Sequence, residues 1–212
     1  MRVIFVTIFV VIVDQISKLW VKGFSIPFLN FNHKGMELGQ SHDVIGSFFR
    51  ITFVENPGMA FGFDVNSGVK LWVSLFTLAA SIGLAVYLYS VRKKELSLRL
   101  SLSFILAGAI GNLIDRLFYG VFFDYSPLCY GRVVDFLDFD FWHFTILGRT
   151  YDRWPVFNVA DMAVSIGVII LLLFYNKRSN SIKAVGNSVA EDKNTETGIV
   201  DPSDEKNSST ES

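Results

Sequence analysis

The sequence predicts an all-α polytopic membrane protein with four transmembrane helices and a small extracytoplasmic β-sheet element. Its 212 residues are 51% hydrophobic, and the mean hydropathy of +0.41 is too high for an ordinary soluble domain. Four apolar stretches are long enough to cross a bilayer, which takes about 20 residues per helix. The predicted spans are Val3–Val21, Val69–Val91, Leu98–Tyr119 and Val156–Tyr175.

The first span resembles a signal peptide at first sight, because Arg2 precedes an apolar core. No small-residue cleavage site follows that core, and Asp14 and Lys18 interrupt it. We therefore expect this segment to be retained as a membrane span.

Basic residues at the helix ends predict the orientation. They flank the ends that the positive-inside rule places in the cytoplasm, which puts both termini there. These residues are Arg2, Arg92, Lys93, Lys94, Arg99, Lys177 and Arg178.

The two long loops, residues 22–68 and 120–155, are then extracytoplasmic. In the first loop, the β-branched and aromatic run Phe48–Glu55 predicts a strand. The turn residues Asn56-Pro57-Gly58 follow and fit a type II turn. The second loop carries Trp142, Tyr151 and Trp154, which suit the aromatic belt at a membrane surface.

We expect one membrane domain over residues 1–178 and a disordered cytoplasmic tail over residues 179–212. Ser, Asn, Glu, Asp and Lys dominate this tail. Such a composition cannot bury enough apolar area to offset the entropy of ordering.

Composition excludes several classes of function. A net charge of −1 argues against a nucleic-acid partner, since phosphate binding needs a basic face. Cys129 is the only cysteine, so no internal disulfide or cysteine-based metal site is expected. His33, His42 and His143 are scattered without an HExxH helix, which argues against a zinc protease. We expect neither a metal nor another cofactor.

Polar residues interrupt three of the four spans at matching depths. An ionisable group at the bilayer centre costs about 2.5–3.5 kcal/mol on insertion scales, so such groups indicate function. With both termini cytoplasmic, all of these residues lie near the outer leaflet. They are Asp14 and Lys18 in the first span, Asn112, Asp115 and Arg116 in the third, and Asn158 and Asp161 in the fourth.

Structural roles compete with catalytic ones at most of these positions. Asp14 and Lys18, four residues apart, favour an ion pair that locks the helices together. The adjacent Asp115 and Arg116 also favour a structural pair. The amides of Asn56, Asn112 and Asn158 can bridge helices through hydrogen bonds. Asp161 has no charged neighbour within its own helix turn, which makes it the best catalytic candidate.

Five sequence blocks, in order, resemble the lipoprotein signal peptidase (signal peptidase II) family. The blocks are Asp14-Gln15-Ile16-Ser17-Lys18, Glu55-Asn56-Pro57-Gly58-Met59-Ala60-Phe61-Gly62, Gly111-Asn112-Leu113-Ile114-Asp115-Arg116, Val133-Val134-Asp135-Phe136 and Phe157-Asn158-Val159-Ala160-Asp161. They cover most of residues 14–161, and five blocks in order on four spans are highly specific.

The resemblance implies an aspartyl endopeptidase of the bacterial cytoplasmic (inner) membrane. Such enzymes remove the signal peptide from prolipoproteins, cleaving just before a diacylglyceryl-modified cysteine, and they are inhibited by globomycin. The residues that match the family's catalytic pair are Asp135 and Asp161. The residues expected to bind substrate or support the site are Asp14, Lys18, Asn56, Asn112, Asp115, Arg116 and Asn158.

One departure from the family pattern leaves a choice open. The usual spacing from the Asp-Arg pair to the first catalytic aspartate is short, but here Leu117–Val134 intervenes. The short spacing falls on Asp124, whereas the local motif surrounds Asp135. We prefer Asp135 and keep Asp124 in reserve. Asp138 and Asp140 are expected to be solvated loop acids.

A proton-coupled small transporter or channel is the alternative function, because it too uses intramembrane carboxylates. Transporters place their polar residues near the midplane and often carry internal repeats or broken helices. This sequence has neither a repeat nor a proline-interrupted span, and its acids gather at one end. The protease is therefore the preferred prediction.

Overall fold

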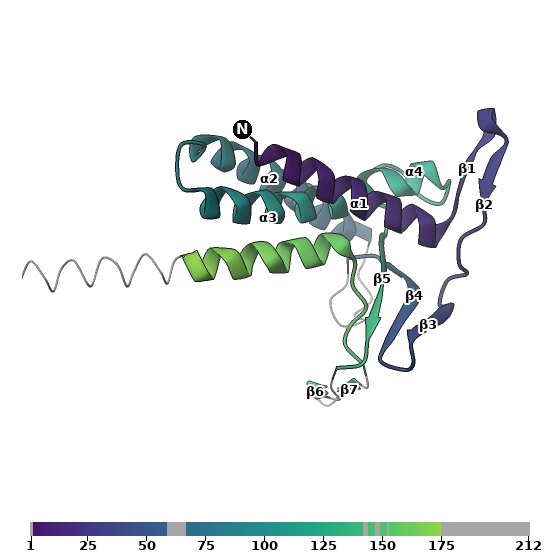
Figure 1. The fold of residues 1–212 in the computed structure, drawn as a ribbon. Coiled ribbons are helices and arrows are strands. Elements are labelled where there is room, and N and C mark those ends of the chain that lie inside the picture. The colour runs from purple at the N-terminus through teal and green to yellow at the C-terminus, as the bar shows by residue number, and fades with distance from the viewer. Residues whose placement is uncertain (1, 59–66, 142–143, 147–148, 152, 175–212) are drawn as a thin grey trace, which may run out of the picture. The chain divides into compact units, whose positions relative to one another are not determined.

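Long apolar helices make up the membrane part of the protein. The structure is a computed structural model, and it describes residues 2–58, 67–141, 144–146, 149–151 and 153–174. They are α1 (Ile4–Lys22), α2 (Ser67–Ser90) and α3 (Leu96–Ile114), and α3 packs against both α1 and α2 (Figure 1). A π-helical turn, η2 (Asp115–Tyr119), and the short α4 (Gly120–Phe122) extend α3. The first three predicted spans are thus confirmed as apolar helices long enough to cross a membrane.

The fourth predicted span appears as an apolar helix over Val159–Phe174. It begins three residues later than the predicted Val156. Phe157 instead pairs with Leu137 in an isolated β-bridge, and the helix starts after Asn158. The described part of this helix is shorter than the other three spans. The predicted tail, residues 179–212, and Trp142 lie outside the described residues.

The helices reverse the burial pattern of a water-soluble protein. On α1, Phe5, Phe9 and Ile16 are exposed, while Asp14 and Lys18 are completely buried. A helix that turns apolar side chains outward and charges inward is suited to lipid surroundings, where intramembrane charges face the protein interior and pair. This pattern agrees with the spans predicted from the sequence.

Strands are more extensive than the all-α prediction allowed. Antiparallel strands β1 (Phe24–Ile26) and β2 (Phe31–His33) form a hairpin around the 3₁₀ turn η1 (Pro27–Leu29). A three-stranded antiparallel sheet has the order β3-β4-β5, and β6 and β7 form a second hairpin. The bounds of these last five strands are Ser41–Ile45, Phe49–Asn56, Val133–Phe139, Phe144–Ile146 and Arg149–Tyr151.

The three-stranded sheet joins the two outer loops. The strand predicted at Phe48–Glu55 is confirmed as β4, but its partner β5 was not predicted. The pairing places Asp135 opposite Val54 and Val133 opposite Asn56. The sheet therefore brings Asp135 of the second outer loop beside the end of β4, which belongs to the first outer loop.

The sheet is anchored to the helices through an apolar cluster. Val21 of α1, Tyr119 of η2, Phe53 of β4, and Val134 and Phe136 of β5 are all buried in it. Burying such side chains contributes roughly 1.5–3 kcal/mol each. Because Val134 and Phe136 flank Asp135, this packing fixes the position of that aspartate relative to the helix ends.

Close contact between α3 and the fourth helix depends on glycine. A Cβ at Gly108 would lie 2.2 Å from the Ala160 carbonyl oxygen, and one at Gly111 would lie 2.6 Å from Asp14 Oδ2. Small residues let helices in membranes approach closely. The two glycines thus bring the start of the fourth helix against α3, where the polar residues gather.

Candidate active site

The polar residues predicted to converge come from α1, β4, α3, η2, β5 and the start of the fourth helix, and they meet at one end of the helices. Their hydrogen bonds link α1, α3, the fourth helix, β4 and β5. Two groups can be distinguished. One is a charge cluster formed by Asp14, Lys18 and Asp115, and the other is a carboxylate pair formed by Asp135 and Asp161.

The charge cluster is fully buried, and Lys18 is its centre. The Lys18 ammonium lies 2.9 Å from Asp14 Oδ2 and 2.9 Å from Asp115 Oδ2, and it donates to Asn112 Oδ1 at 3.0 Å. These three contacts use all three ammonium hydrogens. The predicted Asp14–Lys18 ion pair is confirmed. Asp115 pairs with Lys18 across the helices, however, and not with Arg116 as the sequence had suggested.

Two polar residues that the sequence analysis did not single out complete the cluster. The Gln15 amide donates to Asp14 Oδ2, Asp115 Oδ1 and the Gly111 carbonyl, and the Tyr119 hydroxyl donates to Gln15 Oε1. Gln15 lies between Asp14 and Lys18 in an otherwise apolar span, which was the available signal. An amide at such a position must find partners when water is absent.

The charge cluster also holds the backbone on either side of the carboxylate pair. Asp14 Oδ1 accepts a hydrogen bond from the Ala160 N–H at 2.9 Å. Asp115 Oδ2 accepts one from the Val134 N–H at 3.1 Å. Ala160 directly precedes Asp161, and Val134 directly precedes Asp135. Each cluster carboxylate therefore fixes the peptide group next to one member of the pair.

The start of the fourth helix positions Asp161. The Asp161 N–H donates to Asn158 Oδ1 at 3.0 Å, and the Asn158 N–H donates to Asp161 Oδ2 at 3.3 Å. This reciprocal arrangement is a capping box, which satisfies two backbone donors at a helix N-terminus. Asn112 of α3 adds a hydrogen bond from its amide to Asp161 Oδ1 at 2.8 Å.

Asp135 is 4% exposed and is held by two carboxamides. Asn158 Nδ2 donates to Asp135 Oδ1 at 2.6 Å, and Asn56 Nδ2 donates to Oδ2 at 3.3 Å. Burial, followed by repulsion from the Asp161 carboxylate, raises the pKa of Asp135 to about 7, against the opposing effect of the two amides. Asn158 thus touches both carboxylates, which interact as a pair.

Arg116 supplies a positive charge close to the pair. Its guanidinium interacts electrostatically with Asp135 and Asp161 as well as with its neighbour Asp115. One of its nitrogens donates to the Asn112 carbonyl at 3.4 Å. Within the described part of the chain, its buried Nε has no hydrogen-bond partner. A buried N–H of this kind can donate a hydrogen bond to a ligand atom such as a carbonyl oxygen.

The reserve candidate, Asp124, lies elsewhere. It is exposed in a turn after α4 and adopts a left-handed backbone conformation, with φ of 54°. The insertion Leu117–Val134 runs through η2, α4 and this turn, and it ends in the first two residues of β5.

The expectation that Asp138 is a solvated loop acid is wrong. Asp138 lies within β5 and is buried. Its carboxylate pairs with Arg153 Nε at 2.7 Å and accepts a hydrogen bond from Thr52 at 2.7 Å. Asp140 pairs with the same arginine at 3.3 Å. Both acids form ion pairs with Arg153, and these pairs connect β5 to the segment that leads into the fourth helix.

Fold and site together define a membrane protein with a hydrogen-bonded carboxylate pair at the end of its helices. A family model described as signal peptidase (SPase) II matches residues 6–176. A lipoprotein signal peptidase of Porphyromonas gingivalis is 38% identical over 200 residues, covering 79% of this chain and 80% of that protein. One of Moorella thermoacetica is 40% identical over 171 residues, covering 81% and 90%.

Solved structures agree with the sequence comparisons. A bacterial membrane enzyme solved by the in meso method matches with a TM-score of 0.58 and 29% identity, covering 85% of this chain and 90% of that one. A second such structure matches with a TM-score of 0.57 and 30% identity, covering 82% and 92%. The chain belongs to the signal peptidase II family, and its apolar helices make it a multi-pass membrane protein.

Proposed function

We propose that this protein is an aspartyl endopeptidase that removes the signal peptide from diacylglyceryl-modified prolipoproteins, cleaving before the lipidated cysteine. The observation that carries the proposal is the pair Asp135 and Asp161, joined through Asn158 and coupled electrostatically. The family and the names of its relatives support the substrate class. The pairing of Asp135, and the exposed position of Asp124, favour Asp135 as the first catalytic aspartate.

The chemistry follows from two carboxylates that share one proton. Two nearby carboxylates do not both ionise readily, so the pair titrates as a unit. The raised pKa of Asp135 favours that residue as the protonated member at neutral pH. Asp161, held by the Asn112 amide and the Asn158 N–H, is then the carboxylate that takes a proton from the attacking water.

The reaction proceeds without a covalent enzyme intermediate in this scheme. Water deprotonated by Asp161 attacks the scissile carbonyl carbon, while Asp135 donates its proton to the carbonyl oxygen. The proton taken up by Asp161 then passes to the leaving amine as the C–N bond breaks, and a hydroxyl of the tetrahedral intermediate returns its proton to Asp135 as the carboxyl group forms. Arg116, through its buried Nε, is placed to bind a substrate carbonyl near the pair.

The setting of the site in the membrane fits a lipid-anchored substrate. Basic residues at the helix ends support cytoplasmic termini, which puts the pair near the outer leaflet of the bacterial inner membrane. Acyl chains on the substrate cysteine would remain in the bilayer while water reaches the carboxylates. Globomycin-type inhibitors are expected to bind at the same carboxylates.

The test is cleavage of a diacylglyceryl-modified prolipoprotein by purified protein in detergent. We compare wild type with Asp135→Asn and Asp161→Asn, and use Asp124→Asn as the matched control. Each of the first two changes should lower the rate by about 100-fold or more, the usual contribution of a positioned acid or base. Asp124→Asn should cleave normally, and thermal unfolding should show all three variants folded.

Two outcomes would contradict the proposal in different ways. Loss of cleavage in Asp124→Asn with normal cleavage in Asp135→Asn would move the first catalytic aspartate to the exposed turn. Failure of wild type to cleave the lipidated substrate would overturn the assigned activity.

A further inference from the structure

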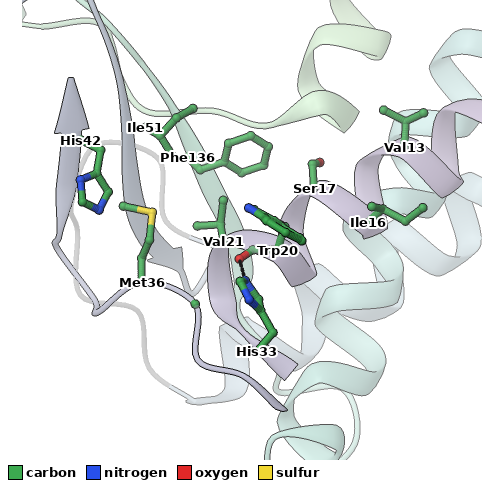
Figure 2. A pocket seen from close by; sticks show the side chains of 11 residues that line it. Val13, Ile16, Ser17, Trp20, Val21, His33, Met36, His42, Ile51 and Phe136 are labelled. Atoms are coloured by element: carbon green, nitrogen blue, oxygen red, sulfur yellow. Dashed lines mark hydrogen bonds between the residues drawn. The ribbon is translucent and has the colours of Figure 1, made fainter. Parts of the chain in front are cut away.

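A cavity lies beside α1, and neither Asp135 nor Asp161 lines it. Its volume is about 700 Å³, and it lies between α1 and the strands β3, β4 and β5. Its walls are mainly apolar and come from Val13, Ile16, Trp20, Met36, Ile51 and Phe136. Figure 2 shows Val13, Ile16 and Ser17 on one side of the cavity, with Met36 and His42 across from them. We call this cavity the α1–sheet groove.

The groove lies on the other side of β5 from Asp135, and on α1 it uses a different face from the charge cluster. Val13, Ile16 and Trp20 follow one another at spacings of three and four, so they share one face of α1. Asp14 and Lys18, which belong to the charge cluster, occupy a different, buried face. On β5, Phe136 follows Asp135, and successive side chains of a strand point to opposite sides. A peptide bond held at Asp135 would therefore not lie in the groove.

The groove is continuous with the apolar outer surface of a membrane-spanning helix. Ile16 is 61% exposed and Trp20 is 65% exposed, and Phe9 and Ile12 extend the same exposed surface along α1. In a membrane protein this surface contacts acyl chains rather than water. The groove therefore opens directly onto lipid, with one wall from the helix and the other from the sheet.

Apart from Ser17, whose hydroxyl donates to the Asp14 carbonyl, the polar side chains of the groove are those of His33 and His42. The His33 ring stacks on Trp20 at 4.5 Å between centroids, and its Nε2 lies 2.7 Å from the Trp20 carbonyl oxygen (Figure 2). The exposed His42 lies on the opposite wall. Aromatic residues with a polar edge commonly sit at the membrane–water boundary. An amphiphile with its head near these histidines would place its tail among the apolar walls.

We propose that the α1–sheet groove binds an acyl chain of a bilayer phospholipid, which fills the space between α1 and the three-stranded sheet. Water has few polar partners in such a cavity, and an apolar cavity of this size binds apolar ligands readily. The bound chain contacts Phe136 and so supports the strand that carries Asp135. This site is independent of the proposed peptidase activity.

The first experiment counts phospholipid retained by the purified protein. Delipidated full-length protein in detergent receives dioleoylphosphatidylglycerol, and native mass spectrometry measures the bound fraction. Ile16→Trp places bulk inside the groove. Ile12→Trp is the matched control, because Ile12 is 49% exposed on the same helix but does not line the groove.

We expect wild type and Ile12→Trp to retain a phospholipid that Ile16→Trp loses, with at least a fivefold difference in the bound fraction. Equal retention in all three proteins would overturn the proposal. A diacylglyceryl-modified peptide is added in a further arm. If that peptide displaces the phospholipid, the groove belongs to the substrate and the assigned occupant is wrong. Since no arm measures cleavage, failure here is distinct from failure of the peptidase assignment.

A second measurement does not depend on the folding of a groove variant. The other three tryptophans, Trp72, Trp142 and Trp154, are replaced by phenylalanine, which leaves Trp20 as the only indole. Phospholipid brominated on its acyl chains is then titrated into the protein in detergent. Saturating quenching of Trp20 at an equimolar ratio supports a bound chain. Quenching that rises without saturation indicates only general contact with lipid and overturns the proposal.

Discussion

The charge cluster and the carboxylate pair are neighbours, and Asn112 forms hydrogen bonds with both Lys18 and Asp161. The side chains that bind the carboxylates nevertheless differ between the two groups. In the cluster, Lys18 lies between Asp14 and Asp115 and bonds to both. In the pair, the protein partners found among the described residues are N–H donors of asparagines. An opposite charge in contact favours the ionised form of a carboxylate, whereas burial and a nearby second carboxylate raise the pKa of Asp135 to about 7. The first arrangement is suited to holding structure, and the second to proton transfer.

The largest expected effect comes from removing the cation of the charge cluster. Lys18→Met leaves Asp14 and Asp115 buried without their partner, which typically costs about 3–5 kcal/mol. The unfolding temperature in detergent should fall sharply. Lys34→Met is the control, because Lys34 is 87% exposed and its ion pair with Glu37 is long, at 3.8 Å. An exposed pair of this kind contributes at most about 1 kcal/mol.

A double variant sharpens this test. Adding Asp115→Asn to Lys18→Met removes one of the two uncompensated charges, so part of the lost stability should return. If Lys18→Met is as stable as Lys34→Met, the cluster does not hold the structure together and its contrast with the carboxylate pair disappears.

In contrast to Lys18→Met, Asp135→Asn should abolish cleavage without lowering the stability of the protein. Because the pKa of Asp135 is raised to about 7, the folded state binds more protons than the unfolded state between about pH 4 and pH 7. Stability falls with rising pH wherever the folded state binds more protons. The wild-type free energy of unfolding should therefore decrease across this window, and Asp135→Asn should remove that part of the decrease.

The measurement is chemical unfolding at several pH values between about 4 and 8, which spans the ordinary and the raised pKa of an aspartate. Asp124→Asn is again the control, since its side chain is exposed. An unchanged pH dependence in Asp135→Asn would mean that Asp135 does not titrate in this range.

The parts of the site that the sequence could predict are those on helices. Regular helical spacing alone places Asp14 with Lys18, and Asn158 with Asp161. The position of Asp135 could not be derived in this way, because it depends on β5 pairing with β4 across a long separation in sequence. The same unpredicted pairing buries Asp138 beside Arg153. Strand pairs formed by distant loops leave little trace in local periodicity.

The contact between α3 and the fourth helix offers a smaller and more local test. Gly108→Ala would place a Cβ 2.2 Å from the Ala160 carbonyl oxygen, one residue before Asp161. Overpacking of this kind costs about 1–3 kcal/mol, and it should also lower the cleavage rate by displacing Asp161. Gly83→Ala is the control, since a Cβ at Gly83 in α2 meets no atom within 4 Å. Equal unfolding temperatures for the two variants would contradict close packing at Gly108.

The smallest expected effect concerns the hydrogen bonds that tune the carboxylate pair. The Asn56 amide donates to Asp135 and favours its ionised form, so Asn56→Ala should raise the pKa of Asp135 further. If Asp135 is the proton donor, activity is lost as it ionises, and this basic limb of kcat/KM should move to higher pH. A hydrogen bond contributes about 0.5–1.5 kcal/mol, which corresponds to a shift of roughly half to one pH unit.

The control for this pH profile is Thr52→Val on the same strand. Thr52 donates to the other β5 aspartate, Asp138, which keeps its ion pair with Arg153. This change should leave the basic limb in place even if it lowers stability, because its effect does not reach the carboxylate pair. A limb that moves equally in both variants would show that general loosening of the sheet sets the profile. A limb that moves only in Asn56→Ala would assign the basic limb to Asp135, which distinguishes a tuned carboxylate pair from the fixed charges of the cluster beside it.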